Sequence, residues 1–111
     1  MKVFTQKNIH LLNSPHLIID AKTLVIVDAN QAAVAAYGYT KEEFLKMDLF
    51  RLIPKSQLSE LKKNTDVEKN QIINFNLPAH KKKNGELMLV QINAEPVSFN
   101  EMDCWDLEVS R

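Results

Sequence analysis

With 111 residues, of which 45% are hydrophobic, the chain has the size of one domain with one modest core. Its 14 basic and 14 acidic side chains cancel, so no overall charge attracts it to nucleic acid or to an anionic membrane surface. The single cysteine, Cys104, excludes an internal disulfide, and neither a signal peptide nor a membrane helix of roughly 20 apolar residues is present in the sequence. We therefore expect a cytoplasmic domain, which could belong to a membrane-anchored parent protein but has no direct membrane contact.

Residues 1–13 are predicted to form an arm or a short capping helix ahead of a domain that spans residues 14–111. Apolar positions recur in this arm with a partly helical spacing, and Ser14-Pro15 ends whatever structure forms there. The arm either lies on its own domain or shares its apolar stripe with a second copy of the chain. The arm residues that we assign to a dimer interface are Val3, Phe4, Leu11 and Leu12.

A predicted β-hairpin follows the arm. Its strands are His16–Asp20 and Leu24–Asp28, two runs rich in β-branched residues, and Ala21-Lys22-Thr23 separates them. Their nearly continuous apolar content indicates central strands that are buried on both faces.

Short helices with separate caps are predicted after the hairpin. Asn30 is a good N-cap for a helix over residues 31–37, and Gly38 supplies the left-handed residue that ends it. Asp48 is expected to cap a further turn over residues 49–53, before Pro54.

Between these two helices, Thr40 and Glu43 have the spacing of a capping box that starts another helix. Tyr39 and Phe44 flank this start at the positions of a hydrophobic staple. A polar helix is expected to follow over residues 55–64, with no evident chemistry. Such short helices are expected to cover a sheet and not to form a bundle.

The next predicted strand covers Gln71–His80, with Phe75 and Leu77 on one face and His80 on the other. Lys81-Lys82-Lys83-Asn84-Gly85 then reads as a turn, because Asn and Gly both tolerate positive φ. The lysines are expected to be solvated and to discourage sheet-edge pairing, and we do not expect them to bind nucleic acid.

Two further strands complete the chain. In Glu86–Ser98, Met88 and Val90 face inward while Leu87 and Leu89 face outward, where they extend the proposed dimer interface or are covered by the arm. In the last strand, over residues 104–110, apolar Trp105, Leu107 and Val109 alternate with acidic residues at positions 106 and 108.

The resulting fold class is α+β: a five-stranded antiparallel sheet with short helices on one face. A small apolar space between the two layers would be the natural place for a ligand, and a filled core is the other interpretation. The candidates for lining that space are Tyr37, Phe44, Phe50, Ile53, Phe75, Leu77, Met88, Val90, Trp105 and Leu107.

Three segments resemble a PAS sensor domain, over residues 13–111. Residues 28–33, DANQAA, are similar to the D-x-N-x-A-A helix start of that family. Residues 37–45, YGYTKEEFL, are similar to its Y-G-Y-[ST]-x-E-E-L segment, and the turn at Gly85 is similar to its R-[RK]-[KR]-[DN]-G turn. The resemblance implies the strand order 2-1-5-4-3 and a role in sensing or dimerisation, not catalysis.

The resemblance also indicates where cofactors would be held. Flavin photosensors of the family place a reactive cysteine in a helix that matches residues 46–53, and haem-binding members commonly place a histidine in the helix at residues 55–64. This chain has neither residue there, so cysteinyl-flavin and haem are disfavoured and the cofactor is unknown. His10, His16 and His80 lack a local spacing for metal binding and are expected to be solvated surface residues.

The leading hypothesis is a sensor module from a bacterial sensor histidine kinase or diguanylate cyclase. A small apolar ligand or a partner would shift the packing of residues 44–53 on the sheet, and the last strand would pass this change to a covalently attached output domain. The alternative is a ligand-free module that dimerises through the arm and the outer face of the sheet. An enzyme is disfavoured, because no histidine or cysteine has an evident partner.

Overall fold

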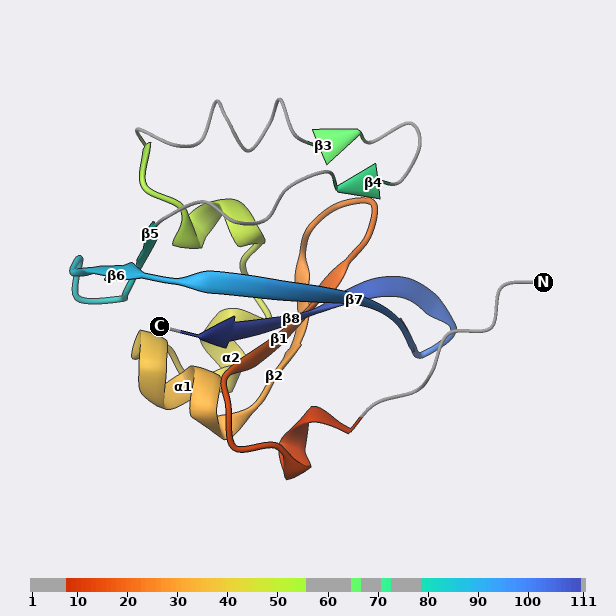
Figure 1. Ribbon diagram of the computed structural model, residues 1–111, viewed down its shortest axis with the longest axis horizontal. Helices are drawn as coiled ribbons and strands as arrows, with labels where there is room; N and C mark the ends of the chain where they lie inside the picture. Colours follow the sequence, from red (N-terminus) through yellow and green to blue (C-terminus); the bar gives the residue numbers. More distant parts are fainter. Residues whose placement is uncertain (1–7, 56–64, 67–70, 73–78, 111) are drawn as a thin grey trace.

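A four-stranded antiparallel sheet with the order β2-β1-β8-β7 is the largest element of the computed structural model, which describes residues 8–55, 65–66, 71–72 and 79–110 (Figure 1). The strand β1 pairs over its whole length with β8, so the first and last hairpins of the chain join at the centre of the sheet. The four strands are β1 (His16–Asp20), β2 (Ile26–Ala29), β7 (Gln91–Phe99) and β8 (Met102–Ser110).

Two short hairpins accompany this sheet. Strands β3 (Thr65–Asp66) and β4 (Gln71–Ile72) form one, and β5 (Ala79–Lys81) and β6 (Leu87–Leu89) form the other. The α+β class with an antiparallel sheet is confirmed, and the four long strands occupy the places expected for 2-1-5-4. The full order 2-1-5-4-3 stays a prediction, because residues 73–78 of the expected third strand lie outside the described residues.

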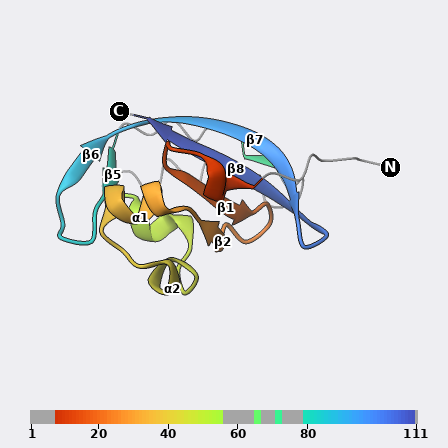
Figure 2. The same ribbon diagram turned by 90° about the horizontal axis from the view of Figure 1, so that it is seen from below.

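Short helices cover one face of the sheet, as Figure 2 shows. They are α1 (Gln31–Tyr37), α2 (Lys41–Phe44) and the 3₁₀ turn η2 (Leu49–Leu52). A further 3₁₀ turn, η1 (Ile9–Leu11), belongs to the arm, and Ile9 packs against the other face of the sheet. Among the described residues, no helix has the length and apolar character needed to cross a membrane.

The caps of α1 and α2 form as expected. The Asn30 side chain accepts a hydrogen bond from the Ala33 amide at 3.0 Å, and Gly38 ends α1 with φ of 85°. The Thr40 hydroxyl accepts from the Glu43 amide at 3.1 Å, and the Glu43 carboxylate accepts from the Thr40 amide at 2.9 Å. These contacts confirm both helix starts and the capping box.

The cap predicted for the third helix was wrong, because the Asp48 side chain makes no capping hydrogen bond. The turn is instead held by the edge of the sheet. Asp48 forms an isolated bridge with Val25, and the Leu49 amide donates to the Leu24 carbonyl at 2.9 Å. The start of η2 is therefore stabilised by backbone contacts with residues 24 and 25, and not by a local side-chain cap.

Two turn details also differ from expectation. Leu24 has φ of 63°, so β2 begins at Ile26 and not at residue 24. In the lysine-rich turn only Gly85 has a positive φ, 92°, while Asn84 contributes through its side chain, which accepts from the Glu86 amide at 2.9 Å. Asn-Gly therefore favours this turn through one left-handed residue and one side-chain hydrogen bond, not through two left-handed residues.

Buried side chains form two clusters, one on each face of the sheet. The larger, which we call the inner core, lies between the sheet and the helices. The smaller, which we call the outer cluster, consists of Ile9, Ile18, Val97 and Cys104. Because both faces are covered, β1 is buried along nearly its whole length, as its continuous apolar sequence predicted.

Candidate functional site

The inner core brings together all the predicted pocket residues that the structure describes. Phe75 and Leu77 lie outside the described residues. Phe50 and Trp105 are partly buried and pack against the inner core. The buried candidates are Tyr37, Phe44, Ile53, Met88, Val90 and Leu107. Helices and sheet thus both contribute to one apolar layer, and its use as a ligand pocket stays a prediction.

A polar pair lies within this apolar layer. The Tyr37 hydroxyl at the end of α1 is 2.6 Å from Nδ1 of His80 in β5, and only 1% of His80 is exposed. Burial lowers the pKa of His80 from 6.5 to about 4, because the imidazolium would lose its hydration. The imidazole is therefore neutral near pH 7, and it offers a hydrogen-bonding group without charge.

A small aromatic cluster packs against the ring of Tyr37. The Phe44 ring meets the Tyr37 ring edge to face, with 5.8 Å between centroids and 81° between planes. Tyr39 packs on the same phenylalanine at 5.5 Å, which is the contact expected of a hydrophobic staple. The end of α1 is thus fixed by ring packing as well as by hydrogen bonding.

The lysine-rich turn is attached to the helices and is not simply solvated. The Lys83 amide donates to the Tyr37 carbonyl at 2.9 Å, and Lys83 Nζ lies 2.9 Å from the Glu43 carboxylate. The hydrogen bond from Lys83, followed by that from the Thr40 backbone, lowers the pKa of Glu43. This turn therefore holds the β5–β6 hairpin against the start of α2.

The prediction that the histidines are solvated was wrong for His16 and His80, which are 2% and 1% exposed. In His80 the alternation pattern was misleading, because its face of β5 is also covered by protein. The statement that no histidine has a partner was wrong too. His10 Nε2 lies 3.0 Å from an Asp28 oxygen, and His16 Nδ1 lies 2.8 Å from an Asp106 oxygen.

The His16–Asp106 pair lies on the face of the sheet that carries the outer cluster. Asp106, which alternates with the apolar residues of the last strand, is only 1% exposed. The Ser14 hydroxyl lies 3.2 Å from His16 Nε2 and donates to the Glu108 carboxylate at 2.9 Å. These contacts form a largely buried polar network between β1, β8 and Ser14, which lies ahead of β1.

Cys104 also lies on that side of the sheet, in the outer cluster. Burial, followed by the nearby carboxylates of Asp20 and Asp103, raises the pKa of its thiol to about 11. The thiol is therefore protonated and unreactive near neutral pH. Within the part of the chain that the structure describes, no group of His, Cys, Asp or Glu side chains has an arrangement suited to a metal ion.

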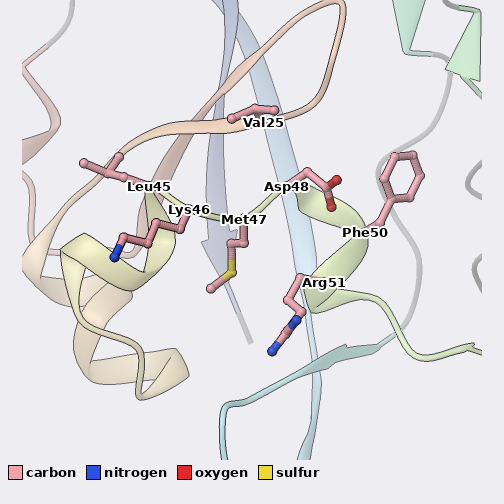
Figure 3. A pocket seen from close by; sticks show the side chains of 7 residues that line it. All are labelled: Val25, Leu45, Lys46, Met47, Asp48, Phe50 and Arg51. Carbon is pink, nitrogen blue, oxygen red and sulfur yellow. The ribbon is translucent and has the colours of Figure 1, made fainter.

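An open hollow of about 510 Å³ lies on the outside of the helix layer (Figure 3). In this view the Met47 and Arg51 side chains both extend downward, whereas the Phe50 side chain extends up and to the right. The lining mixes charged and apolar side chains and is wide open to solvent, so it does not enclose a ligand. Its residues are Val25, Leu45, Lys46, Met47, Asp48, Phe50 and Arg51.

The predicted dimer residues are exposed where the structure describes them, and Val3 and Phe4 lie outside the described residues. Leu87 and Leu89 are 61% and 75% exposed, and Leu11 and Leu12 of the arm are also exposed. In both views the described part of the arm, residues 8–13, lies away from β6 (Figures 1 and 2). Among the described residues, the two halves of the predicted interface therefore lie apart within one chain, and the dimer interface stays a prediction.

Comparisons with known proteins agree on the fold. A sequence model of the PAS domain family matches residues 14–103. The PAS domain of a protein from Desulfitobacterium hafniense is similar in structure, with a TM-score of 0.74 and 19% identity over 92% of this chain and 95% of that chain. No curated protein matches the sequence.

Two further structures extend the comparison. A PAS domain from a two-component sensor histidine kinase has a TM-score of 0.64 and 15% identity, and covers 92% of this chain and 87% of its own. The PAS domain of nitrogen regulation protein NR(II) from Vibrio parahaemolyticus has a TM-score of 0.62 and 14% identity, with 93% of each chain covered. At these identities the similarity supports the fold alone.

Proposed function

The chain belongs to the PAS domain family, and from this premise we propose that it senses a signal by holding a small, mainly apolar ligand between its helices and its sheet. The module is sensory and not catalytic. The matched range starts at residue 14, which supports a division into an arm, residues 1–13, and a domain, residues 14–111.

The observation that carries the ligand proposal is the Tyr37–His80 pair inside the inner core. An apolar layer that contains one uncharged polar pair suits a ligand with an apolar body and one hydrogen-bonding group. A charged ligand would be poorly accommodated there, because His80 is neutral near pH 7 and a buried charge without a partner is costly.

Signal output would follow from a shift in populations. A ligand that binds two packings of residues 44–53 on the sheet unequally favours one of them, and β8 would pass this change to a covalently attached output domain. A sensor histidine kinase or a diguanylate cyclase is our proposed bacterial parent. One similar structure comes from a two-component sensor histidine kinase, which favours the first. We place the domain in the cytoplasm, where the free, buried Cys104 would remain reduced.

A ligand screen tests this function. Thermal-shift measurements with neutral apolar compounds should yield at least one that raises Tm, and native mass spectrometry of freshly purified protein should reveal any ligand carried along. Tyr37→Phe should weaken such binding about tenfold, since one buried hydrogen bond is lost. Leu89→Asp, at an exposed position, should leave binding unchanged. If no compound changes Tm and the mass equals that of the polypeptide alone, the ligand proposal fails.

A ligand-free dimerisation module is the second candidate, and the exposure of Leu87 and Leu89 in β6 favours it. Light scattering should then give the mass of a dimer for the native chain and of a monomer for the double variant Leu87→Asp, Leu89→Asp. Leu45→Asp is the matched control, because Leu45 is also exposed but lies on the helix layer. An unchanged mass in the double variant would exclude this interface.

A further inference from the structure

We propose that helix α1 links the Tyr37–His80 pair mechanically to the arm, so that a change at the pair alters how firmly the arm is held. The two ends of α1 are both tied by buried side chains, one to the arm and one to β5. The role of a ligand in this coupling rests on the proposed function, but the link itself is a property of the unliganded chain.

At the first end, Asn30 joins three parts of the molecule. Its side-chain oxygen accepts from the Ala33 amide of α1 and from the His16 amide of β1, both at 3.0 Å. Its side-chain nitrogen donates to the carbonyls of Ile9 at 3.0 Å and of Ser14 at 2.8 Å. Asn30 is 1% exposed, so water does not replace these bonds readily. The N-cap of α1 is therefore also an anchor of the arm.

The arm has few other attachments among the described residues. Ile9 is fully buried in the outer cluster, and His10 contacts Asp28 at 3.0 Å. Beyond the arm, the Pro15 carbonyl accepts from the Val109 amide of β8 at 2.9 Å. Leu11, between these contacts, is 79% exposed. The loss of the Asn30 bonds should thus loosen the arm without disrupting the sheet.

At the second end, Tyr37 ties α1 to the β5–β6 hairpin. Its hydroxyl binds His80, and its carbonyl accepts from the Lys83 amide at 2.9 Å. The helix between the two ends has only seven residues, about 10 Å in length, and Ala33 in its first turn is fully buried. We expect so short a helix to move as a rigid body. A displacement of Tyr37 would then also displace Asn30 and strain its hydrogen bonds to the arm.

Asn30→Asp separates the two roles of Asn30. Aspartate is also a good N-cap, so it keeps the bond to the Ala33 amide, but it has no N–H group for the Ile9 and Ser14 carbonyls. Amide hydrogen exchange followed by NMR measures both the retained cap of α1 and the loosened arm. The Leu12 amide, which donates to the Ile9 carbonyl at 3.1 Å, should exchange about tenfold faster in Asn30→Asp, while the Ala33 amide keeps its protection.

Tyr37→Phe then tests whether the far end of α1 reaches the arm. It should speed exchange at Leu12 several-fold, and it should add nothing further in the Asn30→Asp background, where the arm is already released. Tyr39→Phe is the matched control, because it removes the same group from a buried tyrosine outside α1. Exchange at Leu12 should remain native in that variant.

Two outcomes would exclude this coupling between the pair and the arm. If Tyr37→Phe leaves Leu12 exchange unchanged, or if its effect is the same with and without Asn30→Asp, α1 does not couple the pair to the arm. His80→Leu removes the hydrogen-bond partner of the Tyr37 hydroxyl from β5, and it replaces Tyr37→Phe in this test if that variant fails to fold, as judged by circular dichroism. No ligand is used, so failure here leaves the ligand proposal intact, and failure of the ligand screen leaves this inference intact.

Discussion

The hydroxyl of Tyr37 lies 2.6 Å from Nδ1 of His80, a residue 43 positions later in the chain. Neither side chain is accessible to water, and the pair is enclosed by the apolar side chains of the inner core. A buried histidine of this kind makes the fold sensitive to acid, because it resists protonation only while the chain is folded.

Acid should destabilise the fold through His80. The pKa of His80 is about 4 in the folded protein against 6.5 for an ordinary histidine, so the unfolded chain takes up a proton between these values and the folded chain does not. Stability is therefore fully present above pH 6.5 and is lost as the pH falls toward 4, by about 3 kcal/mol from this residue.

Urea unfolding at several pH values between 7.5 and 4 measures this loss, and His80→Gln provides the comparison. Glutamine retains hydrogen-bonding capacity toward Tyr37 but does not titrate. The free energy of unfolding of the variant should fall less over this range than that of the native chain. Parallel pH profiles would show that His80 titrates normally in the folded state.

Removal of only one partner of the buried His16–Asp106 pair should lower the free energy of unfolding strongly. Asp106→Ala leaves Nδ1 of His16 without its partner at 2.8 Å in a site that is 2% exposed, and it should lower the free energy of unfolding by about 3 kcal/mol. The double variant His16→Leu, Asp106→Ala should be more stable than the single variant, because no polar ring is then left behind. A double variant that is the less stable of the two would contradict this account.

The capping box should contribute measurably to stability. Thr40→Ala removes the hydroxyl that accepts from the Glu43 amide, and the expected loss is about 1 kcal/mol in chemical denaturation. Ser110→Ala, which removes a hydroxyl from an exposed position in β8, should change stability little. Equal effects of the two substitutions would mean that the cap has no special role.

The turn between β7 and β8 offers a stabilising substitution. Glu101 has φ of 66°, a left-handed conformation that glycine adopts without strain, and Asn100 before it has φ of 48°. Glu101→Gly should therefore raise the free energy of unfolding by roughly 0.5–1 kcal/mol. Glu101→Ala keeps the strained Cβ and should bring no gain. The same change in both variants would exclude backbone strain as the cause.

Local patterns predicted local structure well. The caps at Asn30 and Gly38 and the capping box at Thr40 depend on residues within one helical turn, and all of them form. Alternation likewise predicted that Met88 is buried and Leu89 exposed. The prediction at Asp48 failed because a contact with the sheet edge, which no local pattern reports, holds that turn.

The sequence by itself determined the two ends of α1, the capped start of α2 and the family, because each depends on residues close together in the chain. Only the tertiary structure decided the surroundings of the histidines. His80 meets Tyr37 across 43 positions and His16 meets Asp106 across 90, and three lysines beside His80 even suggested a surface. Burial and hydrogen-bond partners are set by how the sheet and helices pack, and that packing joins residues whose spacing in the sequence carries no signal.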